Sequence, residues 1–209
     1  MSGGPNATPQ IHAILFEPVG CLAEFPAEPF LDMAARFTGK KQSSKSGSRA
    51  YWHMLNVMES ASPGVEALEI EAVERASVYE DVGPALAELR KLGIKLCIAS
   101  SLSEAALARF VEKTGESFAV VSSREKAGGI KQRPLLHALD RENLQAAQTM
   151  FLTDTAEGMK AAEAAGVKAV LMMNDPDESR RLSMRNPFGG IVSLHELPDF
   201  IRLLRAQAS

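Results

Sequence analysis

Short apolar runs alternate with segments of helical periodicity along most of the chain, and this alternation constrains the fold more than any other feature. Six runs have strand length and are mostly rich in Ile, Val, Leu or Phe: Ile11–Phe16, Ile94–Ala99, Phe118–Val121, Thr149–Leu152, Val167–Met173 and Ile191–Leu194. Between them, apolar residues recur at helical spacing, as at Val82, Leu86 and Leu89. Buried strands that alternate with helices predict an α/β fold, with a parallel sheet covered by helices on both faces.

The alternation is interrupted once, directly after the first run. Residues 23–79 contain no strand-like run, and three segments within them have helical spacing: Pro29–Phe37, Tyr51–Met58 and Val65–Val78. A polar stretch, residues 39–48, separates the first two and predicts a mobile loop. We therefore expect a small helical domain at 23–79 inserted into a core domain of residues 11–22 and 80–209, with residues 1–10 as a flexible terminus.

Composition excludes several classes of protein. The chain has 209 residues, of which 45% are hydrophobic and 23% charged, as in an ordinary globular protein. Its formal net charge of −3 gives no basic field of the kind that nucleic-acid binding needs. Two cysteines outside any metal-binding spacing, with no signal peptide or long apolar run, predict a cytoplasmic protein that contacts no membrane.

Polar side chains follow several of the predicted strands, where ligands bind in open parallel sheets. Glu17 follows the first strand, Ser100 and Ser101 the second, Lys131 lies beyond the third, and Asp154 follows the fourth. Hydroxyls, a lysine and helix amides together suit a phosphate group. The spacing from Ser101 to Glu104 is that of a capping box, which places Ser100 and Ser101 at a helix start. The Asp154 carboxylate either caps the helix that follows it or holds a cation.

Four segments carry a resemblance to a known family. AILFEPVGCL, GIKLCIASS, GGIKQRP and FLTDTAEGMKAAEAAGV resemble, in order and spacing, motifs one to four of the haloacid dehalogenase-like (HAD) superfamily. The resemblance is to the branch that contains phosphoglycolate phosphatase and β-phosphoglucomutase, and it covers nearly the whole chain after residue 10. It implies a Rossmann-like core with a helical cap inserted after motif one, which would account for residues 23–79.

The resemblance also implies roles for single residues. Ser100 matches the Ser or Thr of motif two, Lys131 the lysine of motif three, and Asp154 the magnesium-binding aspartate of motif four. Motif one departs from the family pattern D-x-D-G-T-L. Glu17 stands where the family has its nucleophilic aspartate, and Val19 stands where it has the aspartate that acts as general acid and base.

Both departures weaken the chemistry that the resemblance implies. Glu17 adds a methylene that moves its carboxylate by roughly 1 Å, a displacement that can cost about 100-fold in rate. Val19 cannot transfer a proton, and losing a general acid typically costs about 10²–10⁴-fold. We therefore expect a phosphatase-related protein with impaired or lost phosphoaspartyl chemistry that still binds phosphate through Ser100, Ser101 and Lys131. The alternatives are an active phosphomonoesterase with Glu17 as nucleophile, and a non-catalytic protein-interaction module.

Magnesium binding is weakened by the same departures rather than excluded. Glu17, the main-chain carbonyl of Val19 and Asp154 can still supply three oxygen ligands to Mg²⁺. In the opposing interpretation, Lys131 pairs with Glu17 or Asp154 as a structural remnant. The expected partner is a small phosphorylated molecule, and the sequence is compatible with a monomer or a homodimer.

Overall fold

A computed structural model describes residues 10–58, 62 and 64–207 of the chain. The N-terminal segment expected to be flexible, residues 1–10, lies outside the described residues except for Gln10.

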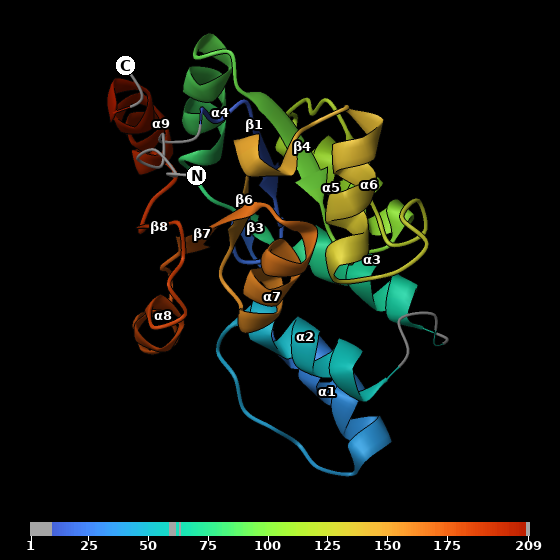
Figure 1. Ribbon diagram of the computed structural model, residues 1–209. Coiled ribbons are helices and arrows are strands. Elements are labelled where there is room, and N and C mark those ends of the chain that lie inside the picture. The colour runs from blue at the N-terminus through green and yellow to red at the C-terminus, as the bar shows by residue number, and fades with distance from the viewer. Residues whose placement is uncertain (1–9, 59–61, 63, 208–209) are drawn as a thin grey trace, which may run out of the picture.

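The centre of the molecule is a six-stranded parallel sheet, as the alternation of strands and helices predicts (Figure 1). Its strand order is β5-β4-β1-β6-β7-β8. The strands are β1 (Ala13–Phe16), β4 (Lys95–Ala99), β5 (Val121–Ser122), β6 (Thr149–Thr153), β7 (Lys168–Met172) and β8 (Gly189–Ile191). The chain runs outward from β1 to β4 and β5 and then returns to β6 on the other side. The sheet therefore has its topological switch point between β1 and β6.

Two strands begin and end away from their predicted positions. The run predicted from Phe118 does contact β4, since the Ala119 amide donates to the Leu96 carbonyl at 2.8 Å, but regular pairing starts at Val121. The last strand ends at Ile191 rather than Leu194, because the Leu194 amide turns away to the Asp81 carboxylate at 2.8 Å.

Helices cover both faces of the sheet. Along β1, Leu15 packs with α6 (Gln132–Arg141) and α7 (Ala156–Ala165) on one face. Its neighbours Ile14 and Phe16 join the larger cluster on the other face. The helices of that second face are α4 (Val82–Lys91), α5 (Glu104–Thr114) and α9 (Glu196–Gln207). All four β1 residues are buried, which explains why the strand is apolar throughout rather than alternating.

The insertion contains the three expected helices, α1 (Glu28–Thr38), α2 (Gly47–Val57) and α3 (Val65–Arg75). The prediction that residues 23–79 hold no strand is wrong. A two-stranded antiparallel ribbon, β2 (Ala23–Glu24) with β3 (Ser77–Val78), joins the two ends of the insertion. Strands of two residues are too short to show a periodicity in sequence. The segment 39–48 lacks regular structure only until Gly47, where α2 begins.

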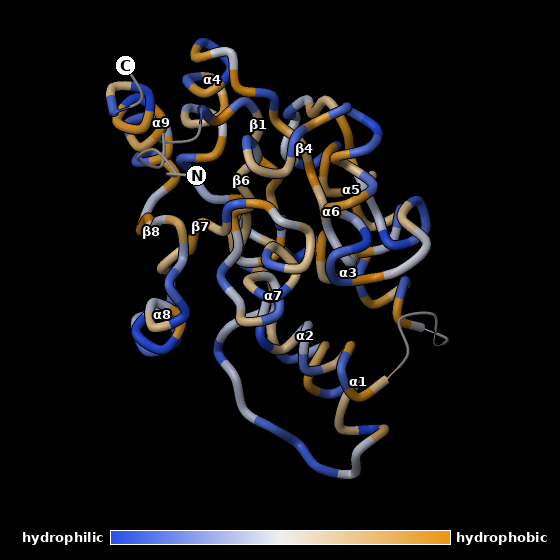
Figure 2. Tube along the Cα trace, in the orientation of Figure 1, coloured by the Kyte–Doolittle hydropathy of each residue, from blue (hydrophilic) through white to orange (hydrophobic). Residues whose placement is uncertain are grey.

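The insertion and the core share one hydrophobic cluster, which includes Phe30, Tyr51 and Val73 of the insertion with Phe110 and Ile98 of the core. In Figure 1, α1 and α2 lie side by side below the sheet, and α3 lies next to the core helices. Figure 2 shows the hydrophobic residues concentrated in the sheet and on the inward sides of its helices, whereas the connection between α1 and α2 is hydrophilic. The insertion is therefore packed onto the core rather than tethered beside it.

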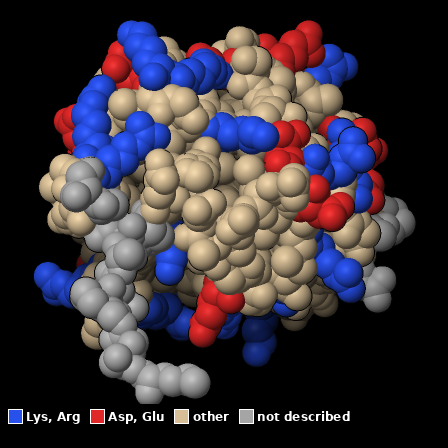
Figure 3. All heavy atoms as spheres, turned by 45° about the horizontal axis from the view of Figure 1, so that its top comes forward, with Lys and Arg blue, Asp and Glu red and all other residues tan. Residues whose placement is uncertain are grey.

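The surface seen in Figure 3 carries both basic and acidic side chains around a broad uncharged area. The longest helix in the described part of the chain, α9, has 12 residues, and none of the described helices is long and apolar enough to cross a bilayer. The remaining regular elements are α8 (Pro176–Ser183) and a 3₁₀ turn at Ala146–Gln148.

Candidate functional site

The candidate site lies at the carboxyl ends of β1 and β6, next to the switch point of the sheet. Glu17 directly follows β1 and Asp154 directly follows β6, and these strands are neighbours with Phe16 paired to Leu152. Both carboxyl groups are buried, with 6% of each residue exposed. The charge of Asp154 contributes to the raised pKa of Glu17, after the larger effect of burial.

Glu17 is held by Ser100. The Ser100 hydroxyl, directly after β4, donates to Glu17 Oε1 at 2.5 Å. Burial raises the pKa of Glu17 to about 8, although the hydrogen bond from Ser100 opposes that shift. Glu17 is therefore mostly protonated at neutral pH in the metal-free protein, and a protonated carboxyl is a poor nucleophile.

Val19 belongs to the hydrophobic core. It is 1% exposed and clusters with Cys21 and Leu22. Burial beside Asp154 and Glu17 also raises the pKa of the Cys21 thiol well above its usual value, so Cys21 stays protonated. Neither side chain that follows Glu17 in this turn can exchange a proton near neutral pH.

Asp154 is engaged by the insertion rather than by its own helix. The Ser48 hydroxyl, in the first turn of α2, donates to Asp154 Oδ2 at 2.5 Å. The alternative that Asp154 caps α7 is wrong, because Thr155 is the N-cap residue and its Oγ1 accepts from the Gly158 amide at 3.1 Å. Asp154 is thereby left available for another partner.

The carboxyl group of Asp154 is buried next to Gly20. Burial raises the pKa of Asp154 to about 7, with the hydrogen bond from Ser48 opposing the shift. Gly20 packs so closely that a Cβ at that position would overlap the carboxylate. The second carboxylate oxygen of Asp154, Oδ1, is buried and has no hydrogen-bond partner. A buried acceptor without a donor costs free energy, and an added cation or donor would relieve that cost.

The carboxylate oxygens of Glu17 and Asp154 are of the kind that a hard divalent cation prefers. They come from fewer side chains than a dedicated metal site has. Glu17 and Asp154 supply carboxylates, and Oδ1 of Asp154 is buried without a hydrogen-bond partner. Among residues 10–58, 62 and 64–207, however, no group of three or more His, Cys, Asp or Glu side chains is arranged to hold a metal ion. Two carboxylates fit Mg²⁺ only if water and main-chain oxygen complete its octahedral shell.

Lys131 lies at the exposed edge of this region. Its side chain is exposed, and among the described residues it forms no ion pair with Glu17, Asp154 or any other acid. The interpretation in which Lys131 pairs with one of those carboxylates is therefore wrong. Its backbone has a positive φ of 64°, and its amide donates to the Ser101 hydroxyl at 3.0 Å.

The expected capping box at Ser101 does not form. Helix α5 begins at Glu104, and its N-cap residue is Ser103, whose hydroxyl accepts from the Ala106 amide at 3.2 Å. The S-x-x-E spacing was misleading here, because two further residues separate Ser101 from the helix. Ser101 instead fixes the loop that carries Lys131.

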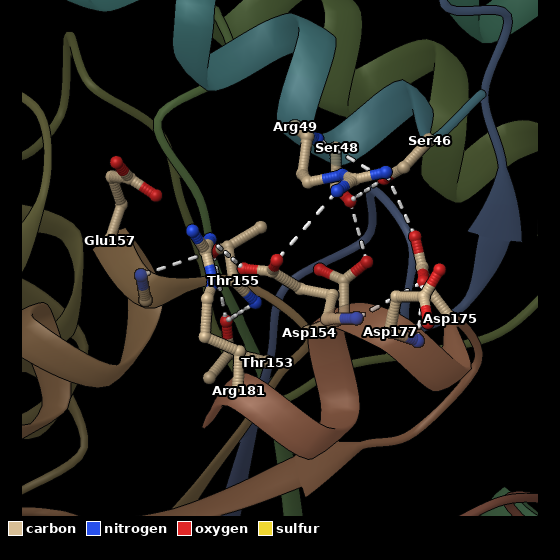
Figure 4. A network of polar contacts seen from close by, with 12 residues as sticks. Ser46, Ser48, Arg49, Thr153, Asp154, Thr155, Glu157, Asp175, Asp177 and Arg181 are labelled. Atoms are coloured by element: carbon tan, nitrogen blue, oxygen red, sulfur yellow. Dashed lines mark hydrogen bonds and ion pairs between the residues drawn. The ribbon is translucent and has the colours of Figure 1, made fainter. Parts of the chain in front are cut away.

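A pocket of about 650 Å³ opens beside Asp154. It lies between the start of α2 and the start of α8, and Figure 4 shows Ser48 and Arg49 of α2 facing Asp154 and Asp175 across it. Its lining residues are Gly20, Glu24, Phe25, Ser43, Ser44, Lys45, Ser46, Gly47, Ser48, Arg49, Asp154, Asn174, Asp175, Pro176 and Asp177. Neither Glu17 nor Lys131 lines this pocket.

A buried ion pair joins the insertion to the core and was missed by sequence reasoning. Arg124 Nη1 lies 2.6 and 2.8 Å from the two carboxylate oxygens of Glu69, a residue of α3 with 0% exposure. The Tyr51 hydroxyl and the Ser103 amide each donate to Glu69 at 3.0 Å. No local pattern marks Glu69 or Arg124, because each looks like a solvated charge in its own segment.

The aromatic residues of α2 also pack inside the insertion, with Tyr51 1% and Trp52 4% exposed.

A family model described as haloacid dehalogenase-like hydrolase matches residues 40–172, more than half of the chain. The matched segment includes Ser100, Ser101, Lys131 and Asp154, and it begins after Glu17 and Val19. No match was found among the curated proteins.

Solved structures similar to this chain have the same fold. A HAD phosphatase from Thermococcus onnurineus is 21% identical with a TM-score of 0.63, covering 91% of this chain and 98% of its own. A predicted phosphatase from Clostridium acetobutylicum is 13% identical with a TM-score of 0.73, over 92% and 99% of the two chains. A provisionally named β-phosphoglucomutase from Bacteroides vulgatus is 17% identical with a TM-score of 0.73, over 98% and 92%. At these identities the likeness shows the fold alone.

Proposed function

Because the chain belongs to the haloacid dehalogenase-like hydrolase family, we propose that it binds a small phosphorylated molecule and that its phosphoryl-transfer chemistry is impaired or lost. The observation that carries this proposal is the chemistry of the turn after β1, where Glu17 and Val19 lie. Val19 is buried in the hydrophobic core at the position of the general acid, and Glu17 is a buried carboxyl whose pKa is raised to about 8. The turn after β1 therefore offers no ionised nucleophile near neutral pH, and the Val19 side chain cannot donate or accept a proton.

The remaining polar groups support binding. Ser100 keeps its place beside Glu17, and Asp154 keeps a buried oxygen without a partner at the edge of a 650 Å³ pocket. Magnesium at this carboxylate would neutralise charge on a phosphate group. With Glu17 protonated and a single ionisable aspartate, we expect Mg²⁺ to bind weakly and more tightly as the pH rises through about 7 to 8.

The test compares hydrolysis of p-nitrophenyl phosphate, with MgCl₂ present, by the native chain, Glu17→Ala and the double variant Glu17→Asp/Val19→Asp. We expect the native chain to be no faster than Glu17→Ala. The hydrolysis rate of the double variant should be at least about 100-fold higher than that of the native chain, because the variant restores both the position of the nucleophilic carboxylate and a proton donor. Circular dichroism verifies that the buried aspartate at position 19 leaves the protein folded.

Two results would contradict the proposal. Steady hydrolysis by the native chain that is abolished in Glu17→Ala would show that Glu17 works as a nucleophile. Absence of any phosphate binding by the native chain, with and without MgCl₂, would remove the binding role.

A further inference from the structure

A second pocket, of about 560 Å³, lies at the opposite end of the sheet from the candidate site. Residues 167–169 line it where β7 begins, whereas Asp154 follows the carboxyl end of the neighbouring parallel strand β6. The other walls come from α7 and from the connection between α8 and β8. A hollow of this volume accommodates a small organic molecule rather than a single ion.

Half of the residues that line this pocket are apolar. Phe188 is half-buried, and its ring packs edge-on against the ring of Phe200 with the two centroids 6.0 Å apart. Apolar side chains that keep some contact with water inside a hollow gain free energy when an apolar ligand covers them. The apolar lining consists of Met159, Val167, Ala169, Pro187 and Phe188.

The wall that carries Phe188 is fixed by the fold. The Phe188 amide donates to the Ala169 carbonyl at 2.8 Å, and the Arg185 amide donates to the Leu182 carbonyl at 2.9 Å. A Cβ at Gly189 would overlap the ring of Phe200, so the glycine allows this ring to approach the backbone next to Phe188. The shape of the pocket therefore does not depend on a ligand.

The charged residues of the lining are three bases, Lys160, Lys168 and Arg185, and one acid, Glu163. Within the part of the chain that the structure describes, none of the three bases takes part in an ion pair. Lys168 Nζ lies 5.6 Å from the centroid of the Phe188 ring, which places a cation directly beside the apolar wall. A local excess of positive charge on a chain with a net charge of −3 attracts anions to this place.

We propose that this pocket binds a small amphipathic anion, a molecule with an apolar body and a carboxylate, sulfonate or phosphate group. The apolar body lies against Phe188 and its apolar neighbours, and the anionic group faces Lys160, Lys168 and Arg185. An inorganic ion would leave the apolar wall uncovered, and an uncharged ligand would leave the three cations without a counter-charge. The site goes beyond the proposed function and does not depend on it, because the two pockets share no lining residue.

The experiment is a fluorescence titration of the full chain with anilinonaphthalene sulfonate, an aromatic anion. Phenylnaphthylamine, which has the same rings without the sulfonate, serves as the uncharged probe. The pocket variant is the triple change Lys160→Gln/Lys168→Gln/Arg185→Gln, and Phe188→Leu tests the apolar wall. The matched control Lys40→Gln/Lys45→Gln/Lys131→Gln removes the same charge from exposed lysines that lie outside this pocket and have no ion pair among the described residues.

We expect the pocket variant to weaken binding of the sulfonate at least about 10-fold, because each exposed charge contributes about 2- to 5-fold. The control variant should change this binding less than about 2-fold, and the pocket variant should change binding of the uncharged probe equally little. Phe188→Leu should weaken binding of both probes about 3-fold or more, because it removes apolar contact area.

Three results would overturn the proposal. Equal weakening by the pocket and control variants would reduce the effect to net charge. Binding that neither the pocket variant nor Phe188→Leu alters would place the probe elsewhere on the molecule. Failure of the native chain to bind the sulfonate would remove the site. None of these results bears on the proposed function, because phosphate binding and hydrolysis are measured separately.

Discussion

Removing the Arg124 side chain should destabilise the protein more than any change of a surface charge, because it leaves a carboxylate buried without a cation. Glu69 is 0% exposed, and Arg124→Ala removes both of its contacts with the guanidinium, at 2.6 and 2.8 Å. Breaking a buried ion pair in this way costs about 3–5 kcal/mol. Tyr51 and Ser103 still donate to Glu69, so we expect the lower end, about 3 kcal/mol.

That free energy converts into a measurable change in melting temperature. With an unfolding entropy of about 2.1 cal/mol/K per residue, a chain of 209 residues has about 0.44 kcal/mol/K, so Tm falls by about 7 °C. The assay is thermal unfolding at neutral pH followed by circular dichroism. The control is Arg109→Ala, which breaks an exposed pair with Glu112 of 3.4 Å and should cost less than about 0.5 kcal/mol, or about 1 °C.

A second variant separates buried charge from lost packing. Arg124→Met/Glu69→Gln keeps an acceptor for Tyr51 and Ser103 and leaves neither charge uncompensated. It should recover at least half of the Tm lost in Arg124→Ala. If Arg124→Ala lowers Tm no more than Arg109→Ala does, or if the double variant is as unstable as Arg124→Ala, then the ion pair does not hold the insertion on the core in the way described.

Two further predictions concern the site. Between about pH 5 and 7 in metal-free buffer, Glu17 keeps its proton in the folded protein, whereas in the unfolded chain, with a pKa near 4.5, it has released it. The unfolding free energy therefore falls as the pH rises, by up to about 1.4 kcal/mol per pH unit. We expect the unfolding free energy of Glu17→Gln, measured with urea at several pH values, to fall less steeply with pH, by about that amount per pH unit. The same pH dependence in the variant and the native chain would count against the raised pKa of Glu17. Gly158→Ala should cost about 1–3 kcal/mol because its Cβ would overlap the Thr153 side chain. Gly83→Ala in α4, with its nearest contact at 3.4 Å, should instead stabilise by about 0.5–1 kcal/mol, and similar effects of the two changes would disprove the steric reasoning.

Local pattern predicted the sheet well because a buried parallel strand must be apolar on both faces. Ile11–Phe16 and Thr149–Leu152 were recognisable for that reason, and their parallel pairing brought Glu17 and Asp154 to neighbouring positions. The capping box at Ser101 failed because the same serine-rich sequence offers three hydroxyls near one helix start, and packing selected Ser103. The β2–β3 ribbon was invisible because two paired residues on each side carry no periodicity.

In the candidate site, too, the positions of the residues were predictable from the sequence, whereas their contacts were not. Its motif residues were found in sequence because each follows a strand, but what each one touches depends on segments far away in the chain. Ser48 meets Asp154 across 106 residues, and Glu69 meets Arg124 across 55. Such contacts depend on how the insertion docks, and docking depends on the shared hydrophobic cluster rather than on any local signal.

The sequence by itself determined the α/β class and predicted that Glu17, Ser100 and Asp154 follow buried strands, because periodicity and residue identity are local properties. Only the tertiary structure decided that Glu17 and Asp154 are buried with raised pKa values, that Lys131 stays at the surface, and that the start of α2 closes a pocket over Asp154. Burial, electrostatic environment and the direction of a side chain depend on every element that packs around a residue, and no short stretch of sequence contains them.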